Sequence, residues 1–589
     1  MSMIALLQMD ATIGALKANQ SKLQQLTGVA ESSGATICVS PELAICGYPP
    51  RDLLLEPEFV RSSFEAARTI QPKLPLLVGT PVPPEHERKK PTNGVVKVEP
   101  QTSSSMMSKS VVAHKQLLPT YDVFDEARYF DADSRTSLVR SMGGFDLGVT
   151  VCEDAWQSAG LTPSTYESDP IEHLSQFIRQ GVELDATVNL SASPYHQHKG
   201  STRIEVCRHA ANTLGHPFLL ANQVGGNDDL LFDGRSMVAW PDGTVVIAPA
   251  WREGVLIVDI HSPSNCAWID APYEAGLTIG HQDTPITLAP SEDGIEGQDI
   301  TELVEAVTTG LADYCRKSNI NGIVLGLSGG IDSAVAACIA QYALGSEHVL
   351  GISMPSRFSS EHSRTDAKHT AVALGIKFMS HSIESLHEAT EATIGSQLSE
   401  GFGVAAENVQ ARLRALIVMG YANSKGYMAI STGNKSEIAQ GYCTLYGDMA
   451  GGYCPLGDVY KMEVYAIAEW FNKKAIAEGR VAPVSESTMT KPPSAELDVD
   501  QKDEDTLPPY AMLDEILRHH IEGGKSQEEI VSFGYGQEIV LDVLTRLERN
   551  EHKRWQMSPA PRVSSRAFGQ GWRRPLASRH QWRRDQHEH

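Results

Sequence analysis

The chain has 589 residues, 41% of them hydrophobic and 21% charged, which are the proportions of a soluble globular protein too long for a single core. Its 50 lysines and arginines against 73 aspartates and glutamates give a formal net charge of −23, which argues against duplex DNA or tRNA binding as the main activity. The nine cysteines show neither a CxxC pair nor a zinc-like spacing, no apolar run reaches ~18 residues and no leader precedes the first strand, so we expect a cytoplasmic protein without a membrane partner.

Residues 1 to about 262 alternate apolar runs with helical stretches, a pattern that predicts an α/β layered domain with a large sheet. Residues 81–109 are rich in Pro, Lys and Ser and suggest an exposed insertion, with a hairpin at Gly94–Val98. The predicted strands are Ile4–Leu7, Thr36–Val39, Leu76–Val78, Val111–His114, Leu147–Val151, Ala186–Leu190, Phe218–Ala221 and Val245–Ile247, and the predicted helices are Asn19–Ser32, Ile171–Gln180 and Thr202–Leu214.

Three reactive side chains follow the ends of predicted strands of this first half. They are Glu42, Lys115 and Cys152. Side chains at the ends of neighbouring strands point into one crevice, where α/β sheets hold ligands. Such a trio can cleave an amide: the cysteine attacks the carbonyl carbon, the glutamate takes the thiol proton and returns it to ammonia, and the lysine stabilises the oxyanion.

Each of these residues also has an ordinary structural interpretation. A cysteine after an apolar strand is usually a small buried hydrophobe, and a lysine or glutamate in a loop is usually at the surface. The acids Glu153 and Asp154 also oppose a preformed thiolate, because nearby negative charge raises the pKa of a thiol. A base on the thiol is therefore required if Cys152 is a nucleophile.

The surrounding segments favour the catalytic interpretation. The segments Pro41–Leu54, His114–Phe130 and Val151–Trp156 resemble the three catalytic segments of the nitrilase family, and most of all its glutaminase branch. The resemblance implies an αββα sandwich and glutamine contacts from Tyr121, Ser193 and Lys199. It also implies that Glu126 is the additional acid that supports the lysine.

A connector is predicted over residues 263–297, followed by an opening helix at Ile300–Lys317 and by a strand, a glycine turn and a helix. The strand begins at Ile323, and the turn Ser328-Gly329-Gly330-Ile331-Asp332-Ser333 leads into an alanine-rich helix. Two glycines at a helix N-terminus favour an anion such as phosphate, and an ordinary tight βα turn is the alternative. The serine hydroxyls can bind phosphate oxygens, and Asp332 could hold magnesium on them. These residues favour the phosphate site over the ordinary turn.

Further elements complete a doubly wound parallel sheet in the second half. Strands are predicted at Val349–Ser353, Lys377–Ser380 and Met428–Ser431, and a helix at 405–419. We expect the helix to pack through its apolar stripe and to leave three polar side chains for solvent, a partner subunit or a phosphate. The stripe comprises Val409, Leu413, Leu416 and Ile417, and the polar residues are Asn408, Arg412 and Arg414.

The glycine turn resembles the pyrophosphate loop of the ATP-pyrophosphatase superfamily, whose Rossmann-like members cleave ATP to AMP and pyrophosphate while adenylating a substrate. Segments 405–419, 432–437, 446–461 and 491–497 resemble one family within it, and the chain over about 1–575 is similar to the glutamine-dependent NAD synthetases. The resemblance implies ATP contacts from Gly326, Leu327, Ser328, Gly329, Gly330, Ile331, Asp332, Ser333 and Thr432, deamido-NAD contacts from Asn408, Glu437 and Lys553, and Mg²⁺ ligands at Asp332 and Glu437.

The implied organisation is a glutaminase domain at 1–262, the connector, a synthetase domain at 298–575 and a basic tail at 576–589. The implied reaction adenylates deamido-NAD with ATP and amidates it with ammonia from L-glutamine, in a homo-oligomer. Another ammonia-using adenylating synthetase is the alternative, although the other glutaminase types use an N-terminal cysteine or a Cys-His-Glu set, and residue 2 here is Ser. A tRNA-modifying pyrophosphatase fits the acidic charge poorly, and a scaffold that keeps both folds would not need every motif residue intact.

Overall fold

The computed structural model describes residues 3–84, 90–100, 109–135, 137–272, 286–287, 300–398, 404–494, 497–498 and 503–578. The chain divides into two compact units, Met1–Gln298 and Asp299–His589. Each unit has its own sheets and its own hydrophobic core, so each is described by itself. Within the described part of the chain, no helix combines the length and the apolar character needed to cross a membrane.

The first unit is built on two facing sheets. One has eight strands in the order β16-β15-β14-β1-β2-β3-β4-β5, the other has six in the order β13-β12-β9-β8-β7-β6, and β10 and β11 form a separate hairpin. The strands are β1 (Ile4–Gln8), β2 (Ile37–Val39), β3 (Leu76–Val82), β4 (Thr92–Val98), β5 (Lys109–His114), β6 (Leu138–Met142), β7 (Phe145–Val151), β8 (Ala186–Ser191), β9 (Phe218–Asn222), β10 (Val224–Asn227), β11 (Leu230–Asp233), β12 (Met237–Ala239), β13 (Val245–Ile247), β14 (Gly254–Val258), β15 (Ala267–Asp270) and β16 (Ile286–Thr287).

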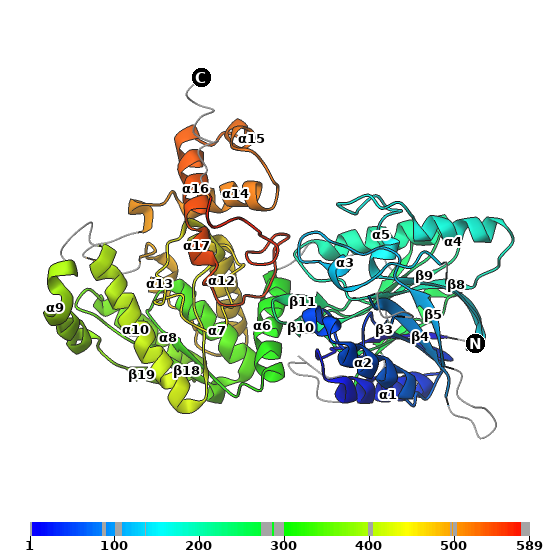
Figure 1. Ribbon diagram of the computed structural model, residues 1–589. Coiled ribbons are helices and arrows are strands. Elements are labelled where there is room, and N and C mark those ends of the chain that lie inside the picture. The colour runs from blue at the N-terminus through cyan, green and yellow to red at the C-terminus, as the bar shows by residue number, and fades with distance from the viewer. Residues whose placement is uncertain are drawn as a thin grey trace. The chain divides into compact units, whose positions relative to one another are not determined.

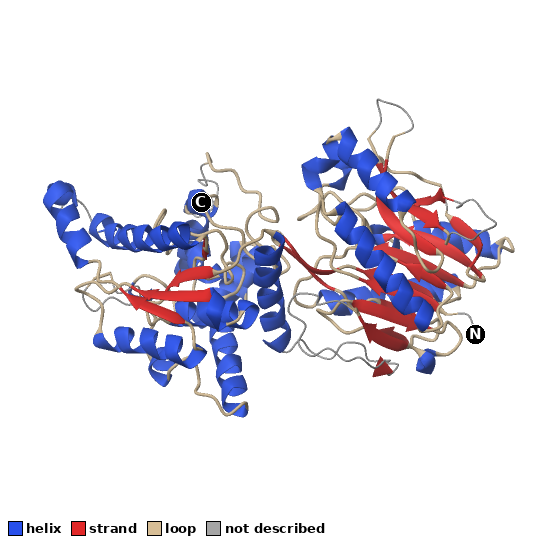
Figure 2. Cartoon of the chain, turned by 90° about the horizontal axis from the view of Figure 1, so that it is seen from below, coloured by secondary structure: helices blue, strands red, loops and turns tan. Residues whose placement is uncertain are grey.

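Helices cover the outer faces of both sheets. Helices α1 (Leu16–Ser32) and α2 (Pro57–Thr69) pack on the eight-stranded sheet, and α4 (Pro170–Arg179) and α5 (Lys199–Leu214) pack on the six-stranded sheet. The remaining helices are short: α3 (Glu126–Tyr129), η1 (Arg51–Leu55), η2 (Cys152–Ala155) and η3 (Pro263–Asn265). A third apolar cluster fills the space between the sheets. The helices flank the sheets in Figure 2, and the predicted αββα sandwich is confirmed.

Two expectations for this unit are corrected. The segment 81–109 is not an insertion with its own hairpin, because β3 continues to Val82 and β4 is an inner strand that pairs antiparallel with both β3 and β5. Strand β15 pairs with β14, so the sheet continues past residue 262 into the segment expected to be a connector. Residues 273–285 and 288–297 of that segment lie outside the described residues.

The second unit contains a parallel four-stranded sheet in the order β19-β18-β17-β20. The strands are β17 (Ile323–Gly326), β18 (Val349–Ser353), β19 (Lys377–Ser380) and β20 (Met428–Ala429). The order places β18 and β20 on opposite sides of β17. This is the switch point at which doubly wound sheets bind ligands, at the carboxyl ends of the strands. The expected doubly wound topology is confirmed.

Helices lie on both sides of this sheet, and a helical layer with a separate apolar cluster follows it (Figure 1). The helices are α6 (Ile300–Lys317), α7 (Ile331–Leu344), α8 (Glu361–Leu374), α9 (Glu384–Leu398), α10 (Val404–Lys425), α11 (Lys435–Gln440), α12 (Lys461–Ala477), α13 (Glu486–Thr490), α14 (Tyr510–Ile521), α15 (Gln527–Ser532), α16 (Gln537–Arg549) and α17 (Glu551–Arg554), with 3-10 turns η4 (Ser346–His348) and η5 (Asp503–Asp505).

Helix α10 differs from its predicted packing. Its buried face combines Gln410 and the small residues Ala411, Ala415 and Ala422 with Val418, whereas Leu416 of the predicted stripe is 62% exposed. Val409, Leu413 and Ile417 are only half-buried. Val418 belongs to the apolar cluster of the sheet and Ile417 of the stripe packs against that cluster, so the stripe is only partly turned to the core.

Candidate functional site

Glu42, Lys115 and Cys152 meet in the core of the first unit. Glu42 follows β2 and Lys115 follows β5, two strands separated by β3 and β4, whereas Cys152 follows β7 of the facing sheet. The expectation that they end neighbouring strands is therefore wrong. The two sheets of the sandwich bring them together instead, at the carboxyl ends of strands in both layers.

The Lys115 ammonium is held between two carboxylates. Its Nζ lies 2.8 Å from Oε1 of Glu42 and 2.7 Å from Oε1 of Glu126, and Lys115 and Glu42 are completely buried. Burial would by itself lower the pKa of the lysine, but the two carboxylates raise it, so Lys115 carries a fixed positive charge. The same burial raises the pKa of Glu126 to about 7.

Cys152 is a buried thiol at a strained backbone position. It begins η2 with a φ of 45°, which L-residues rarely adopt, and its side chain contacts the apolar cluster between the sheets. Burial raises the pKa of the thiol, Glu42 raises it further, and Lys115 opposes both. The thiol is therefore protonated at neutral pH, and a base is needed to turn it into a nucleophile.

Three further residues position these groups. Asn93 donates from Nδ2 to Oε1 of Glu42 at 2.7 Å, and Tyr48 donates from its hydroxyl to Oε1 of Glu126 at 2.8 Å. Asp154 accepts the backbone N–H groups of Gln116, Leu117 and Val151 at 2.9 to 3.0 Å. Asp154 thereby joins the chain after Lys115 to the strand before Cys152. The sequence missed Asn93 because its strand was interpreted as an exposed insertion.

A second cluster lies around the neighbouring acid Glu153. Its carboxylate accepts the hydroxyl of Tyr121 at 2.9 Å and that of Tyr166 at 3.0 Å. The ammonium of Lys199 lies 4.2 Å from the centre of the Trp156 ring and helps to lower the pKa of Glu153, which burial raises. Ser193 is buried, and its backbone N–H donates to Asn222 at 2.9 Å.

The cluster around Glu153 includes two groups that the sequence analysis did not assign to the site. Glu153 directly follows Cys152, but it was considered only as a charge that opposes the thiolate. Tyr166 lies in a segment without periodicity. The Gln157 side chain donates to the backbone carbonyl of Tyr166 at 2.7 Å and accepts the backbone N–H of Tyr166 at 3.0 Å. No local sequence pattern indicates that the Tyr166 ring reaches Glu153.

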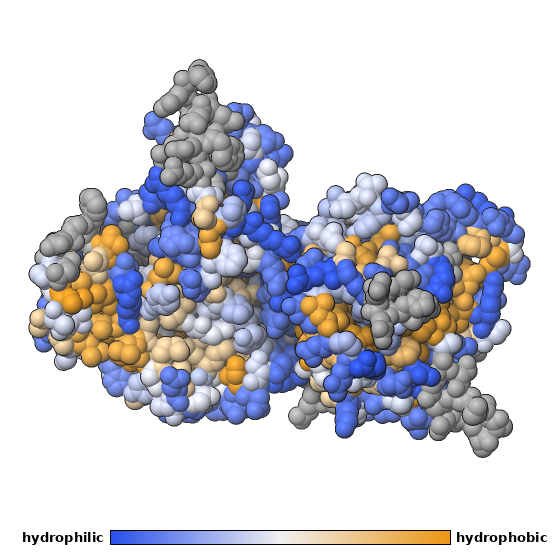
Figure 3. Space-filling model, viewed as in Figure 1, coloured by the Kyte–Doolittle hydropathy of each residue, from blue (hydrophilic) through white to orange (hydrophobic). Residues whose placement is uncertain are grey.

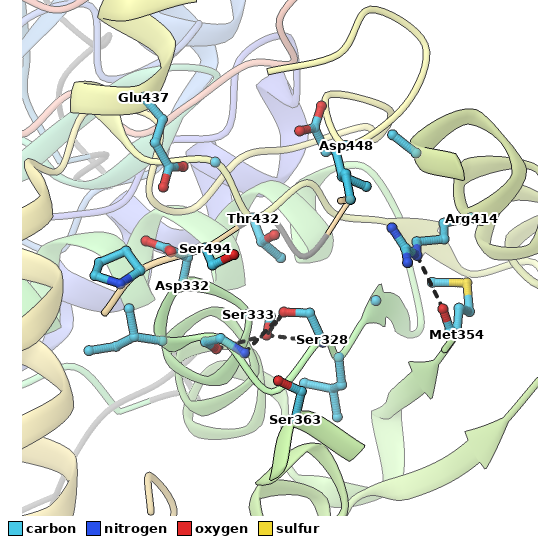
Figure 4. A pocket seen from close by; sticks show the side chains of 18 of the residues that line it. Ser328, Asp332, Ser333, Met354, Ser363, Arg414, Thr432, Glu437, Asp448 and Ser494 are labelled. Carbon is cyan, nitrogen blue, oxygen red and sulfur yellow. Dashed lines mark hydrogen bonds between the residues drawn. The ribbon is translucent and has the colours of Figure 1, made fainter. Parts of the chain in front are cut away.

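The second unit contains a cavity of about 300 Å³ at the carboxyl edge of its sheet. Figure 4 shows side chains of the glycine turn and of the loop after β20 facing it. Among the residues predicted to bind ligands, the cavity is lined by Gly326, Leu327, Ser328, Gly330, Ile331, Asp332, Ser333, Thr432 and Glu437. It is also lined by residues that the sequence did not assign to it, such as Met354, Lys461 and Lys491.

The glycine turn is shaped for close backbone approach. Gly329 has a φ of 84°, and a Cβ added there would lie 2.2 Å from the carbonyl oxygen of Ser363, so only glycine fits. The Ser328 and Ser333 hydroxyls lie 3.1 Å apart, and Ser328 accepts the N–H of Gly330 at 3.1 Å. Helix α7 begins immediately afterwards, so its free N–H groups and dipole face this end of the cavity.

Two carboxylates and one ammonium group form the charged wall of the cavity. The Nζ of Lys461 lies 2.6 Å from Oδ2 of Asp332 and 3.0 Å from Oε1 of Glu437. Asn434 donates to Oδ1 of Asp332 at 2.8 Å. Burial and the charge of Asp332 raise the pKa of Glu437 to about 8, against the effect of Lys461. Lys461 was not predicted, because it lies 129 residues beyond Asp332 in the chain.

Asn408 and Lys553 support a loop of the cavity and are not among its lining residues. Asn408 accepts the hydroxyl of Thr444 at 2.7 Å, and Lys553 donates to the carbonyls of Gly441 and Cys443 at 2.7 and 2.8 Å. The same loop contributes Gly447, Asp448 and Ala450 to the cavity. These contacts fix the loop, so both residues lie one layer behind the lining.

The fold and the two sites define a class of protein: an enzyme that combines a carbon–nitrogen hydrolase module with an α/β nucleotide-binding module. The carbon-nitrogen hydrolase family model matches residues 3–269, and the NAD synthase family model matches residues 303–557. The chain belongs to the family of glutamine-dependent NAD(+) synthetases, since it is 39% identical to the protein of that name from Synechocystis sp. over 98% of both chains. It is also 35% identical to the one from Thermotoga maritima over 98% of both chains.

Solved structures agree with this membership. The glutamine-dependent NAD+ synthetase of Acinetobacter baumannii in complex with adenosine diphosphate has 30% sequence identity and a TM-score of 0.68, with 98% of each chain covered. The glutamine-dependent NAD(+) synthetase of Cytophaga hutchinsonii has 21% identity and a TM-score of 0.72, covering 99% of this chain and 98% of that one, and supports the fold.

Proposed function

We propose that this protein converts deamido-NAD into NAD by ATP-dependent amidation, using ammonia that it releases from glutamine. The observation that carries the proposal is the buried Glu42–Lys115–Cys152 cluster in a chain that also holds a phosphate-binding turn. We assign glutamine cleavage to the domain predicted at 1–262, with β15 added to its sheet, and amidation to the domain at 298–575. Residues 579–589 of the predicted basic tail lie outside the described residues, and we assign no function to the tail.

Glutamine cleavage uses the three clustered residues in distinct roles. Glu42 accepts the Cys152 thiol proton as the sulfur attacks the amide carbon, and Glu42 then transfers that proton to the departing ammonia. Lys115 supplies the positive charge that stabilises the oxyanion, and Glu126 holds the lysine in place. Water activated by Glu42 hydrolyses the thioester and releases glutamate. The protonated thiol of the resting state agrees with this order of events.

Recognition of glutamine is assigned to the cluster beside Cys152. The Glu153 carboxylate, which accepts the hydroxyls of Tyr121 and Tyr166, suits the α-ammonium group of a free amino acid. Lys199 and Ser193 suit its α-carboxylate. An ammonium and a carboxylate site together would distinguish free glutamine from the amide side chain of a protein.

The amidation occurs in the cavity of the second unit. The nicotinate carboxylate of deamido-NAD attacks the α-phosphorus of ATP and releases pyrophosphate, because a carboxylate does not react with ammonia until it carries a better leaving group. Ammonia then attacks the adenylated carbonyl carbon and releases AMP. The turn from Gly326 to Ser333 and Thr432 are assigned to ATP, and Glu437 to deamido-NAD, with Asn408 and Lys553 fixing the loop that covers it.

The residues of this cavity also fit magnesium. Asp332 and Glu437 present carboxylate oxygens to the same space, and oxygen is the ligand that Mg²⁺ prefers. The described residues contain no group of three or more metal-binding side chains, which agrees with an ion that takes its other ligands from phosphate and water. Magnesium bound there would neutralise phosphate charge. Lys461 already provides a positive charge between the two acids.

We also propose that the protein works as a homo-oligomer in the cytoplasm. All nine cysteines lie among the described residues, and all are unpaired, as expected in a reducing compartment. Figure 3 shows an orange, hydrophobic surface over the region of α9 and α10. Val404 and Leu416 of α10 are 53% and 62% exposed. A mass from light scattering equal to one 64.1 kDa chain at working concentration would contradict the oligomer.

The experiment that tests the function measures AMP, pyrophosphate and NAD formation from deamido-NAD, ATP and magnesium, with either glutamine or ammonium as the nitrogen source. We expect the three products in equal amounts with both sources. Turnover of another carboxylate with ATP, and none of deamido-NAD, would replace the proposal with a different adenylating synthetase. Failure with both sources in a folded, ATP-binding protein would contradict it.

A further inference from the structure

Ser191 lies beside the nucleophile at the edge of the six-stranded sheet. It is the last residue of β8, and the parallel register of β7 and β8 pairs Val151 with Leu190. The next residues of the two strands, Cys152 and Ser191, are therefore neighbours. A cross-strand contact fixes this edge, because Asn189 donates from Nδ2 to the backbone carbonyl of Cys152 at 3.3 Å.

The Ser191 hydroxyl has no hydrogen-bond partner of normal geometry in the resting protein, although it is close enough to Cys152 to lower the pKa of the thiol. Its backbone carbonyl accepts the N–H groups of Glu42 at 3.4 Å and Gln223 at 3.1 Å, and the following residue, Ala192, donates to Oε2 of Glu42 at 3.2 Å. The side chain is fully buried, yet its Oγ makes no hydrogen bond of normal geometry. A buried hydroxyl without a partner is unfavourable, so its retention needs a reason.

The thiolate of Cys152 would provide that reason. Burial, Glu42 and Glu126 raise the pKa of the thiol, and Lys115 and the Ser191 hydroxyl lower it. The Lys115 ammonium is already shared between Glu42 and Glu126. Of the groups that favour the thiolate, Ser191 is the neutral donor whose hydrogen is not engaged elsewhere.

We propose that Ser191 is a positioning residue for glutamine cleavage, whose hydroxyl donates a hydrogen bond to the Cys152 sulfur once Glu42 has taken the thiol proton. This inference rests on the proposed cleavage of glutamine. The proton moves from Sγ to a carboxylate oxygen of Glu42, and Ser191 keeps its own hydrogen throughout. The hydroxyl thus stabilises the charge on sulfur without taking part in proton transfer.

The test measures the rate of Cys152 alkylation by iodoacetamide against pH, in the full-length protein, with modified peptides identified by mass spectrometry. Ser191→Ala should move the midpoint of the profile upward by about one pH unit, because a hydrogen bond to a charged group is lost. It should also lower kcat for glutamine about 10-fold with KM within about twofold, since the effect lies on the reacting sulfur. Ser191→Thr, which keeps the hydroxyl, should restore the wild-type midpoint.

Ser175→Ala is the matched control, because Ser175 is another buried serine of the same unit, and its hydroxyl donates to the carbonyl of Thr213 on the outer layer. It should leave the alkylation profile unchanged. Ammonium-dependent NAD formation should be unchanged in every variant, and the urea unfolding curve of each variant shows whether its first unit is folded. If Ser191→Ala does not fold, Ser191→Gly removes the hydroxyl without adding volume and carries the same expectation.

A wild-type alkylation profile in Ser191→Ala or Ser191→Gly, or a shifted profile in Ser191→Thr, would overturn the inference. The alkylation assay uses no glutamine, so it is independent of the proposed function. If the wild type fails to cleave glutamine while the profile shifts as expected, the hydrogen bond stands and the assigned substrate is wrong.

Discussion

The two candidate sites of this chain differ in how far their charges are already satisfied. In the first unit the Lys115 ammonium is enclosed by Glu42 and Glu126, and Cys152 is only 5% exposed. In the second unit Lys461 also lies between two acids, but the group borders a cavity of about 300 Å³. The first site is complete before substrate arrives, and the second is completed by it.

The chemistry of the substrates explains this difference. An amide is small and neutral, so a dry and prearranged site can stabilise the charge that develops on it. ATP and a dinucleotide are large and multiply negative, so their site must be open, and its two acids would bind the proposed cation in addition to Lys461. Variants of the two sites should therefore fail in different ways.

The largest expected effect comes from Cys152→Ala. Glutamine-dependent NAD formation should fall roughly 10⁴-fold or more, because the variant has no nucleophile. Ammonium-dependent formation should stay within about twofold of wild type, since Cys152 has no part in phosphoryl or acyl transfer in the second unit. Initial rates of NAD formation with glutamine and with ammonium measure the two expected effects. Equal loss with glutamine and ammonium would show that the two sites are not separable.

The next effect comes from Asp332→Asn in the second unit. NAD formation should fall about 100-fold with both nitrogen sources, because the variant loses one charge on a proposed cation ligand and one partner of Lys461. Asp542→Asn is the control, since Asp542 forms an exposed pair with Arg546 on α16 and should have no effect. Pyrophosphate release gives the rate. A defect confined to the glutamine reaction would contradict the assignment of Asp332.

A smaller effect is expected from Glu153→Gln. The KM for glutamine should rise roughly 10-fold to 100-fold, because the variant keeps the shape of the side chain and loses the charge that pairs with an α-ammonium group. Release of ammonia from glutamine and from an amide of the same length without the α-amino group separates binding from chemistry. Glu172→Gln, at the surface of α4, is the control. Equal loss with both amides would show that Glu153 acts on cleavage itself.

The smallest effect concerns the stability of the first unit. His216 is buried against the hydroxyl of Thr187 at 2.8 Å, and burial lowers its pKa from 6.5 to about 4. The unfolded chain therefore binds a proton more readily between these values, so acidification from pH 6.5 towards pH 4 should cost about 1 to 3 kcal/mol of stability.

Urea unfolding at pH 7.5 and pH 4.5, followed by circular dichroism, measures this loss. His216→Gln should reduce the difference between the two curves, because the variant has no group to titrate. His552→Gln, at an exposed position of α17, should leave the difference as in the wild type. An unchanged difference in His216→Gln would assign the pH dependence to other groups.

Much of the fold was predictable because its elements carry local signals. The strands that contain or precede Glu42, Lys115 and Cys152, and the strand, turn and helix around Gly329, were placed by apolar runs bounded by polar residues. Strand β4 was missed because the residues before and after it are rich in Pro, Lys and Ser, whereas the strand itself is inside a sheet. The composition of the whole segment 81–109 is polar, so it gave no indication that β4 within it is buried.

The predicted stripe on α10 was only partly correct, for a related reason. Periodicity identified a helix, but it could not say which face meets the sheet. The face with Ala411, Ala415 and Val418 is buried, whereas Leu416 is exposed. Whether a helix buries its large or its small residues depends on the spacing of its neighbours, which is a property of the folded chain.

The sequence by itself determined the two units, their α/β class and the short motifs that carry Cys152 and the glycine turn, since each depends on residues close together in the chain. Only the tertiary structure decided which distant groups meet: Asn93 with Glu42, Tyr166 with Glu153, and Lys461 with Asp332. The physical reason is that hydrogen bonds and ion pairs form between groups that folding brings within about 3 Å, whatever their separation in the chain.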